Sequence, residues 1–592
     1  MKKNAILLFI FISASCFSQS YIEGYIYDKE ANTPVPYATI KIISAKNYYT
    51  ISNEDGKIEI NTKYKPDSLE VRSLGFDTKK VHISYLKNTK IIYLTPKINK
   101  LKTVSIVAKK QKNYVYNILH NLIRKYKKKD LIIKSKMFLR HTSYTKDVPL
   151  EIIESFYNSQ QSLSMGIINL SLKSGRFGQN STFPFYSLHN TDIVKSFNLF
   201  KKTNKMLPLF PGNLGYGALK LKYNLEFEQC SNCGYQDVAI SFEPNNQNGR
   251  FLSGKIIFNK ETLIIKKIKL NIINPKIKGL SSVVKNHFVT PKKINISYIF
   301  DPNDYEKIQS VDFEFVMNYF NSNGELKIIT SNSYLYFYDY GKLFEEPYFT
   351  SKIYFDNDYD KIVSLYASDD FWDSNYQFPR SIKDKKFIDY FKKYGYLINY
   401  DAEIPYNDMD DISASVITWR NGKILNWKDI KDEYSSNKKD EPLYYNSDGS
   451  LKTSVTFSSE FELRKYLSKK KKIEEYNFSY SLDSYVKNGK LQFTTQTLFD
   501  ANSSFCKFRV PKKLIYINII FDMYEVYNKE LKMLLNDEIT FEEAKILCDE
   551  KFKEATELIN IMKRETNFGL NFQKLKRWQT RIKRRLNRTT YY

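Results

Sequence analysis

Two cysteines near the middle of the chain have the spacing that most directly suggests chemistry. Cys230 and Cys233 form a C-x-x-C pair between two segments, 226–229 and 238–242, that are patterned as strands. A thioredoxin-type redox pair would instead begin a helix, so we favour a disulfide that closes a small hairpin loop. A redox pair or half of a metal site is the alternative. Zinc would need a second C-x-x-C or a nearby histidine pair, and the sequence has neither.

The other reactive side chains do not form a recognisable motif. The sequence has no H-E-x-x-H zinc motif, no G-x-S-x-G nucleophile elbow and no phosphate-binding loop. The acidic run at 407–411 lacks the glycine and the distal glutamate of a calcium loop. The five histidines are scattered over the chain, at His82, His120, His141, His189 and His287. We therefore predict no catalytic residue, cofactor or metal, and a protein that is not an enzyme; a hydrolase site assembled from distant residues stays an alternative.

The last helical segment carries the strongest charge pattern. Apolar residues recur on one face of residues 572–588 and basic residues surround them. Such a helix can lie on an anionic membrane or bind a partner, and a terminal helix packed on its own domain is the alternative. The predicted contact residues are Phe572, Leu575, Arg577, Trp578, Arg581, Ile582, Arg584 and Arg585.

The N-terminus has the layout of a secretory signal peptide. Met1–Lys3 is positively charged, residues 5–14 are almost entirely apolar, and small residues follow. We predict a signal peptide at 1–18 with cleavage after Ser18, and lipid modification of Cys16 is the alternative. The protein is then exported, to the periplasm or the periplasmic face of the outer membrane.

Composition indicates a folded, multidomain protein. The chain has 592 residues, 47 of them tyrosines and 41 phenylalanines, which suffices for several cores at about 150 residues per domain. No apolar run after the signal approaches the roughly 20 residues of a spanning helix. The net charge of +27 would suggest nucleic acid in the cytoplasm, but export favours an anionic envelope surface or an envelope protein as partner. An AT-rich genome, which favours lysine, is the alternative explanation for this charge.

Residues 19–97 read as short strands separated by Asn, Asp and Gly turns, which indicates an antiparallel β-sandwich. Four segments carry a resemblance: Gly24–Asp28, Pro34–Ile40, Ser52–Gly56 and Ser73–Phe76. Together they resemble the carboxypeptidase-regulatory-like domain of exported Bacteroidota proteins. That resemblance implies a folding or interaction module without peptidase chemistry.

The spacing of apolar residues divides the rest of the chain into helical and β-rich regions. We predict a linker and amphipathic helix at 98–130, a central β-rich domain at 131–395, an α+β region of unknown family at 396–510 and a C-terminal helical segment at 511–592. Asn421-Gly422 predicts the turn of a hairpin over 417–425, and Thr540 with Glu543 predicts a capping box. Residues 251–268 are weakly similar to lipoprotein-carrier-like half-barrels, which implies a curved antiparallel sheet.

The predicted fold class is therefore multidomain and mainly β, with a sandwich, a central curved antiparallel sheet with helices, and an α+β part that ends in helices. The predicted function is binding or scaffolding in the cell envelope. A carrier that holds a lipid on the concave apolar face of the central sheet is the first alternative, and an open cavity there would favour it. A central sheet whose apolar face is simply packed under a helix is the competing interpretation.

Overall fold

The computed structural model describes most of the chain from residue 20 to residue 588. The described residues are 20–43, 48–62, 66–97, 108–183, 185, 187, 199–201, 207–229, 236–277, 287–302, 304–321, 324–355, 357–365, 369–375, 378–400, 415–422, 424–432, 444–445, 451–452, 474–487 and 489–588. The predicted signal peptide, Cys16, the 98–107 linker, the Cys230/Cys233 pair and the 407–411 acidic run lie outside these ranges.

The N-terminal domain is a β-sandwich of two small sheets. Their strand orders are β4-β1-β7 and β3-β2-β5-β6. The elements are β1 (Ser20–Asp28), β2 (Thr39–Ile43), β3 (Tyr48–Ile51), β4 (Lys57–Thr62), β5 (Ser68–Arg72), β6 (Lys79–His82), α2 (Ile83–Thr89) and β7 (Ile91–Leu94). Inward residues such as Ile22, Ile26 and Ile40 fill a core of their own. The predicted sandwich is confirmed, with one parallel strand pair, β1 with β7, among antiparallel ones.

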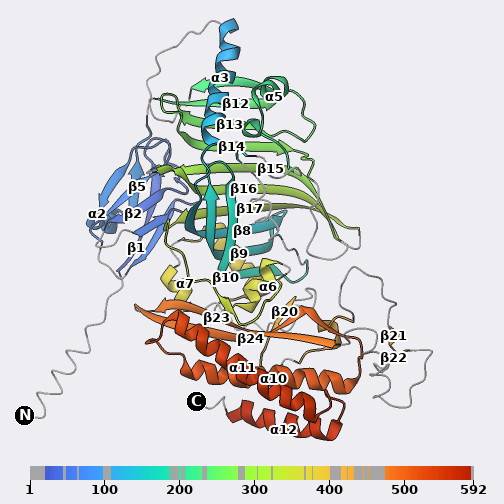
Figure 1. Ribbon diagram of the computed structural model, residues 1–592. Helices are drawn as coiled ribbons and strands as arrows, with labels where there is room; N and C mark the ends of the chain where they lie inside the picture. The colour runs from blue at the N-terminus through green and yellow to red at the C-terminus, as the bar shows by residue number, and fades with distance from the viewer. Residues whose placement is uncertain are drawn as a thin grey trace, which may run out of the picture.

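The central part is one antiparallel sheet of eleven strands, in the order β11-β12-β13-β14-β15-β16-β17-β8-β9-β10-β19. The sheet crosses the upper half of Figure 1. Its strands are β8 (Ile133–Thr145), β9 (Val148–Ser162), β10 (Gly166–Asn180), β11 (Tyr223–Gln229), β12 (Asp237–Pro244), β13 (Ser253–Asn259), β14 (Ile265–Ile273), β15 (Phe288–Asp301), β16 (Asp304–Phe320), β17 (Leu326–Tyr338) and β19 (Gly395–Ile398). β8 is the first strand of this sheet along the chain, yet it pairs with β17, which comes nine strands later.

One face of the central sheet is apolar and covered. Helix α3 (Ala108–Tyr126) runs across the strands in Figure 1, and its Leu119, Leu122 and Ile123 are buried against the sheet. Short helices η1 (Pro211–Asn213) and α5 (Tyr216–Lys222) and the segment around Phe200 extend this cover. Alternate residues of each strand, such as Phe313 on β16, complete this core, as the period of two requires.

The C-terminal part combines a four-stranded sheet with three helices in one core. The sheet has the order β18-β23-β24-β20. The elements are β18 (Tyr348–Phe349), β20 (Val416–Thr418), β23 (Glu474–Lys487), β24 (Lys490–Cys506), α10 (Pro511–Leu534), α11 (Phe541–Glu565) and α12 (Phe572–Arg588). The predicted capping box is confirmed, because Thr540 Oγ1 accepts from the Glu543 amide and the Glu543 carboxylate accepts from the Thr540 amide. The predicted 417–425 hairpin is wrong: β20 pairs with β24 instead, and residues 424–426 are not a strand.

Three short helices connect the central sheet to the C-terminal part. They are α6 (Asp358–Ser364), α7 (Asp369–Asn375) and α8 (Ile382–Tyr394), and α8 leads directly into the edge strand β19. Buried Lys173 on β10 forms an ion pair with Asp483 on β23, which joins the two large sheets. Within the described ranges, none of the helices has the length and apolar character needed to cross a membrane.

Candidate functional site

The N-terminal sandwich contacts the face of the central sheet opposite α3, through the segments that carried the sequence resemblance. The Tyr37 ring stacks on Tyr334 of β17, with centroids 4.0 Å apart and planes at 13°. The Asn53 side chain donates to the Arg380 carbonyl oxygen at 3.0 Å, and Asp55 accepts from the Ile382 amide at 2.7 Å. These contacts fix the sandwich against both the sheet and the start of α8.

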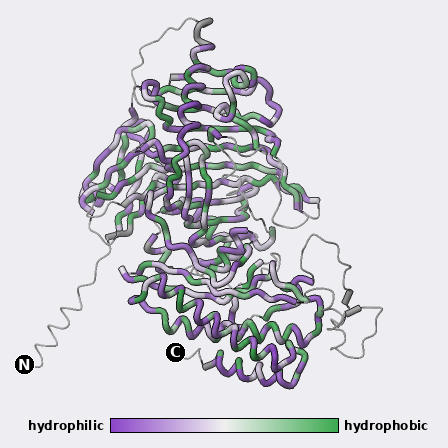
Figure 2. The backbone as a smooth tube through the Cα atoms, in the orientation of Figure 1, coloured by the Kyte–Doolittle hydropathy of each residue, from purple (hydrophilic) through white to green (hydrophobic). Residues whose placement is uncertain are grey.

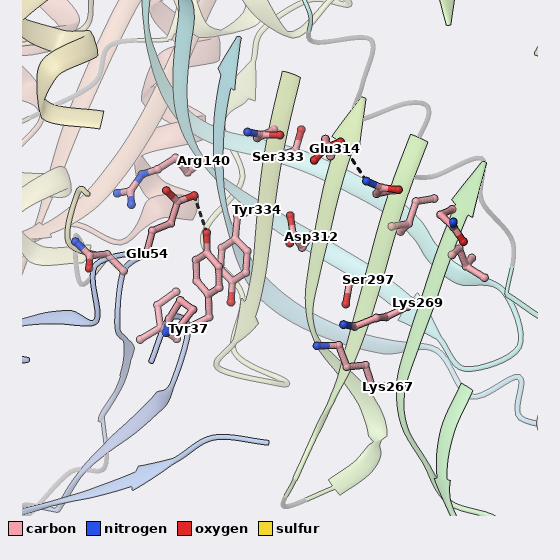
Figure 3. Close-up of a pocket in the computed structure, with 18 of the residues that line it drawn as sticks. Tyr37, Glu54, Arg140, Lys267, Lys269, Ser297, Asp312, Glu314, Ser333 and Tyr334 are labelled. Carbon is pink, nitrogen blue, oxygen red and sulfur yellow. Dashed lines mark hydrogen bonds between the residues drawn. The ribbon is translucent and has the colours of Figure 1, made fainter. Parts of the chain in front are cut away.

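A cleft of about 760 Å³ lies between the sandwich and the sheet. Figure 3 shows Tyr37 and Glu54 on the side of the sandwich, and the labelled side chains of the sheet opposite them. Tyr37 has a positive φ of 55°, and its hydroxyl donates to Glu54 at 3.1 Å. The left-handed backbone at Tyr37 is uncommon for a residue with a side chain, and it occurs at the edge of this cleft.

Polar residues in register form the floor of the cleft and continue beyond it, to Glu154 and Arg176, under the chain that leads into α8. Because side chains alternate between the faces of a strand, directly paired residues on neighbouring strands share a face. One row crosses β14, β15, β16, β17, β8, β9 and β10 through Lys269, Ser297, Asp312, Tyr334, Arg140, Glu154 and Arg176. A second row, two residues along the same strands, contains Asn271, Asn295, Glu314, Asn332 and Thr142.

Several groups on this floor have no partner within the described part of the chain. The Ser297 hydroxyl is buried and makes no hydrogen bond there, which is costly for a buried polar group. Lys267 and Lys269 form no ion pair with the described residues, whereas Glu314 is engaged by Lys293 at 2.9 Å. The floor therefore offers a hydroxyl and ammonium groups to a ligand.

Two of the floor groups have shifted pKa values for reasons visible in the geometry. Burial, assisted by the positive charge of Lys269, lowers the pKa of Lys267 to about 8. Burial, assisted by the negative charge of Glu54, raises the pKa of Asp312 to about 6. Both groups consequently titrate close to neutral pH, so the charge of the cleft depends on pH in that range.

A buried carboxylate with three arginines lies at the end of the first row. Glu154 is fully buried and accepts from Arg140 at 2.9 Å, Arg176 at 2.9 Å and Arg380 at 2.7 Å. Burial alone would raise the pKa of Glu154, but the charges of the three arginines outweigh it and hold that pKa well below its usual range. Arg140 also donates to the carbonyl oxygens of Phe378 and Pro379, so the cluster fixes the chain leading into α8.

The opposite, covered face holds a serine, a histidine and a glutamate together. The Ser187 hydroxyl lies 2.6 Å from His141 Nε2 and also donates to Glu151, which additionally accepts from the Tyr359 hydroxyl. Burial lowers the pKa of His141 to about 3 and raises the pKa of Glu151 to about 8. The histidine is therefore neutral and the carboxyl protonated at neutral pH.

This buried cluster has the residue types of a hydrolytic triad but a different connectivity. In a triad the carboxylate orients the histidine, whereas here Glu151 bonds the serine and His141 Nδ1 is satisfied by Ser333 at 2.7 Å. His141, Glu151 and Ser187 are at most 4% exposed, so a substrate would reach them only if the core opened. The hydrogen bonds among these side chains are those of a buried polar cluster that stabilises the core.

The structure also places the residues predicted on the last helix. Leu575, Trp578 and Ile582 are buried in the core shared with α10, so this apolar face is covered by the protein itself. Phe572 remains exposed, and Arg577, Arg581 and Arg584 lie on the solvent side, whereas Arg585 pairs with Glu530. Leu575, Trp578 and Ile582 thus lie on the buried side of α12, whereas Arg577, Arg581 and Arg584 lie on the side that faces solvent.

The apolar face that a lipid carrier would use is filled. Leu119 and Leu122 of α3 and Phe200 are fully buried among the apolar residues of the sheet. This face therefore forms a packed core under α3, which counts against the carrier alternative. No group of three or more His, Cys, Asp or Glu that could hold a metal ion occurs in the described ranges.

The cleft residues were missed by the sequence analysis, although a signal for them exists. In residues 311–319 polar Asp312, Glu314 and Asn318 alternate with apolar residues, and residues 293–299 show the same alternation. That pattern indicates a polar sheet face but does not say which strands share it or that another domain lies over it. The strand order supplied the first fact, and the contacts of the N-terminal sandwich supplied the second.

Comparison with known proteins bears on the N-terminal domain only. A family model described as the CarboxypepD_reg-like domain matches residues 22–106, which confirms the predicted type of N-terminal domain. No curated protein matches the sequence. Solved structures similar to part of the chain include that of MucB, with 9% identity and a TM-score of 0.14 over 38% of this chain and 93% of that one. MucB in complex with MucA(peri) has 6% identity and a TM-score of 0.12 over 38% and 94%; at these scores neither bears on fold or function.

Proposed function

We propose that this chain is an exported cell-envelope binding protein without catalytic activity, which acts at the periplasmic side of the outer membrane. The observation that carries the proposal is the polar cleft between the N-terminal sandwich and the central sheet. Its floor combines amide, hydroxyl, carboxylate and ammonium groups, several of which are unpartnered among the described residues. Such a surface suits a hydrophilic segment of an envelope partner, which would complete those hydrogen bonds.

The arrangement of the domains supports binding rather than carriage of a lipid. The apolar face of the sheet is occupied by α3, so a hydrophobic ligand would have to displace a well-packed helix. The cleft on the other face is lined largely by polar side chains and is bordered by the CarboxypepD_reg-like domain, whose resemblance implies a folding or interaction module. The two domains are held together by the Tyr37–Tyr334 stack and the hydrogen bonds to the start of α8, so the cleft is preformed.

The test combines native fractionation with a cleft variant. The mature protein is isolated from fractionated host envelopes, its N-terminus is determined by mass spectrometry, and copurifying molecules are identified. We expect a terminus at Gln19, or a lipid-modified Cys16, in the periplasmic or outer-membrane fraction. A chain that keeps Met1 and stays in the cytoplasm would contradict the proposal.

The cleft variant K269Q/D312N/E314Q keeps the side-chain sizes while removing charged groups of the floor. Its matched control is E550Q/K553Q/E557Q on the exposed side of α11, which changes the same kinds of charge. We expect the cleft variant to lose the copurifying partner at least tenfold, whereas the control retains it; for scale, two lost charge-assisted hydrogen bonds correspond to roughly 3 kcal/mol. Equal recovery of the partner with both variants would show that the cleft is not its binding site.

A further inference from the structure

Helix α12 concentrates positive charge on its exposed side. It carries eight lysines and arginines in its 17 residues and no acidic residue. Arg577, Arg581 and Arg584 follow one another at the i, i+4 and i+7 positions of one face, and all three are exposed. Like charges at this spacing repel one another on a helix. Within the described part of the chain no carboxylate lies within ion-pair distance of these three arginines, whereas neighbouring Arg585 pairs with Glu530.

The orientation of α12 is fixed, so the arginines cannot turn inward. Leu575, Trp578, Ile582 and Leu586 are at most 9% exposed in the core shared with α10. The Trp578 indole also donates to the Glu565 carboxylate at 2.9 Å, which fixes the helix to the end of α11. The basic side therefore faces solvent permanently.

The shape and position of this surface suit a flat, extended anion rather than a small one. A shallow hollow of about 880 Å³ runs along the outer side of α12, lined by Gln573, Lys576, Arg577, Thr580, Arg581, Arg584 and Arg585. In Figure 1 the helix is the outermost layer of the C-terminal part, and Figure 2 shows its hydrophilic residues on that outer layer. Exposed Phe568 and Phe572 lie beside the beginning of the helix, at 39% and 48% exposure. Aromatic side chains next to a basic helix are typical of contacts with the membrane interface.

We propose that the arginine face of α12, defined by Arg577, Arg581 and Arg584, binds the phosphate groups of an anionic phospholipid surface. Charge supplies most of the attraction, because the apolar side of the helix is already buried against α10, and exposed Phe568 and Phe572 add a limited aromatic contact at the interface. The contact is therefore peripheral and depends on the lipid charge and the ionic strength, unlike that of an amphipathic helix that inserts into the bilayer. This proposal is independent of the cleft and extends the proposed function by naming the surface to which the protein attaches.

Vesicle cosedimentation of the full mature chain tests the proposal. We expect binding to vesicles that contain phosphatidylglycerol, no binding to vesicles of phosphatidylcholine alone, and release by high salt. At about 1 kcal/mol per basic residue near an anionic surface, R577Q/R581Q/R584Q should weaken binding roughly 100-fold. The matched control K385Q/K386Q/K553Q removes three exposed charges elsewhere and should bind within about twofold of the wild type.

A charge-retaining variant keeps the test decisive. R577K/R581K/R584K should bind like the wild type, because a lipid surface attracts charge without requiring the planar geometry of arginine. Circular dichroism would show that all variants keep their helices. Equal binding to neutral and anionic vesicles, loss of binding in the lysine variant, or prevention of binding by millimolar inorganic phosphate at constant ionic strength would each overturn the proposal. So would failure to bind vesicles combined with tight binding to an acidic protein.

Discussion

Replacing Glu154 by glutamine should destabilise the protein strongly, because it removes the buried carboxylate with which Arg140, Arg176 and Arg380 all pair. Glu154 is fully buried and the three arginine side chains are 10–23% exposed, so the charges left behind are poorly solvated. Breaking a buried ion pair by removing one partner costs about 3–5 kcal/mol. We expect E154Q to lower the free energy of unfolding by this amount at neutral pH.

The matched control is E306Q, the same change in the same sheet. Among the described residues Glu306 forms an ion pair with Lys129 alone, and both side chains are more than 40% exposed, so its loss should cost less than about 1 kcal/mol. Urea unfolding monitored by tryptophan fluorescence suits the measurement, because Arg176 lies 3.9 Å from the centre of the Trp372 ring and that ring reports on the cluster. The chain has several cores, so the transition that includes Trp372 is the one to compare.

The pH dependence provides a second readout of the same cluster. Since the pKa of Glu154 is depressed in the folded state, its contribution is complete above the unfolded pKa, near 4.5, and is lost as the pH falls towards the folded value. The wild type should therefore lose stability on acidification below about pH 4.5 more steeply than E154Q. If E154Q and E306Q unfold at similar urea concentrations, or if their acid profiles coincide, the account of the buried cluster is wrong.

Three further predictions address the domain contact, the buried cluster and the sheet. Y37A should weaken the contact between the N-terminal sandwich and the central sheet, since a stacked aromatic pair contributes about 0.5–1.5 kcal/mol beyond its burial. In limited proteolysis, Y37A should be cut between the two domains faster than Y37F, which keeps the ring on Tyr334. The pKa of Glu151 is raised to about 8, so its contribution to the stability of the fold is complete below pH 4.5 and is lost as the pH rises towards 8. E151Q should therefore flatten the dependence of the urea midpoint on pH between these values, and an unchanged slope would contradict this. G254A should destabilise the central sheet by about 1–3 kcal/mol, because φ is +151° there and a Cβ would lie 2.0 Å from the Lys269 carbonyl oxygen; a thermal transition like that of the wild type would refute the steric argument.

The sequence predicted the elements far better than their arrangement. The alternation around Ile22 and Ile40 and the turn motifs gave the sandwich, and the spacing of Leu119 and Leu122 gave α3, because both patterns are local. The capping box at Thr540 marked the beginning of α11 for the same reason. The hairpin at Asn421-Gly422 failed because β20 finds its partner in β24, about 80 residues further along the chain.

The candidate site could not be predicted because it depends on register and domain contact. Ser297 and Asp312 share a face only because β15 and β16 pair as they do, and Tyr334 joins them from β17. The docking of Tyr37 on Tyr334 joins residues almost 300 positions apart. On α12 the pattern identified both faces correctly, but α10, which covers the apolar one, is visible only in the fold.

The pairing of β8 with β17 also governs when the central sheet can form during synthesis. β8 ends at Thr145 and β17 begins at Leu326, so the three strands β8, β9 and β10 are made long before their neighbour exists. Until β17 emerges, β8 is an exposed edge with unpaired backbone groups, open to pairing with other chains. Closing the sheet late, over so many intervening residues, makes folding slow. We expect a chain of this topology to benefit from protection during its biogenesis, and truncation before residue 338 should leave an aggregation-prone fragment rather than a smaller domain.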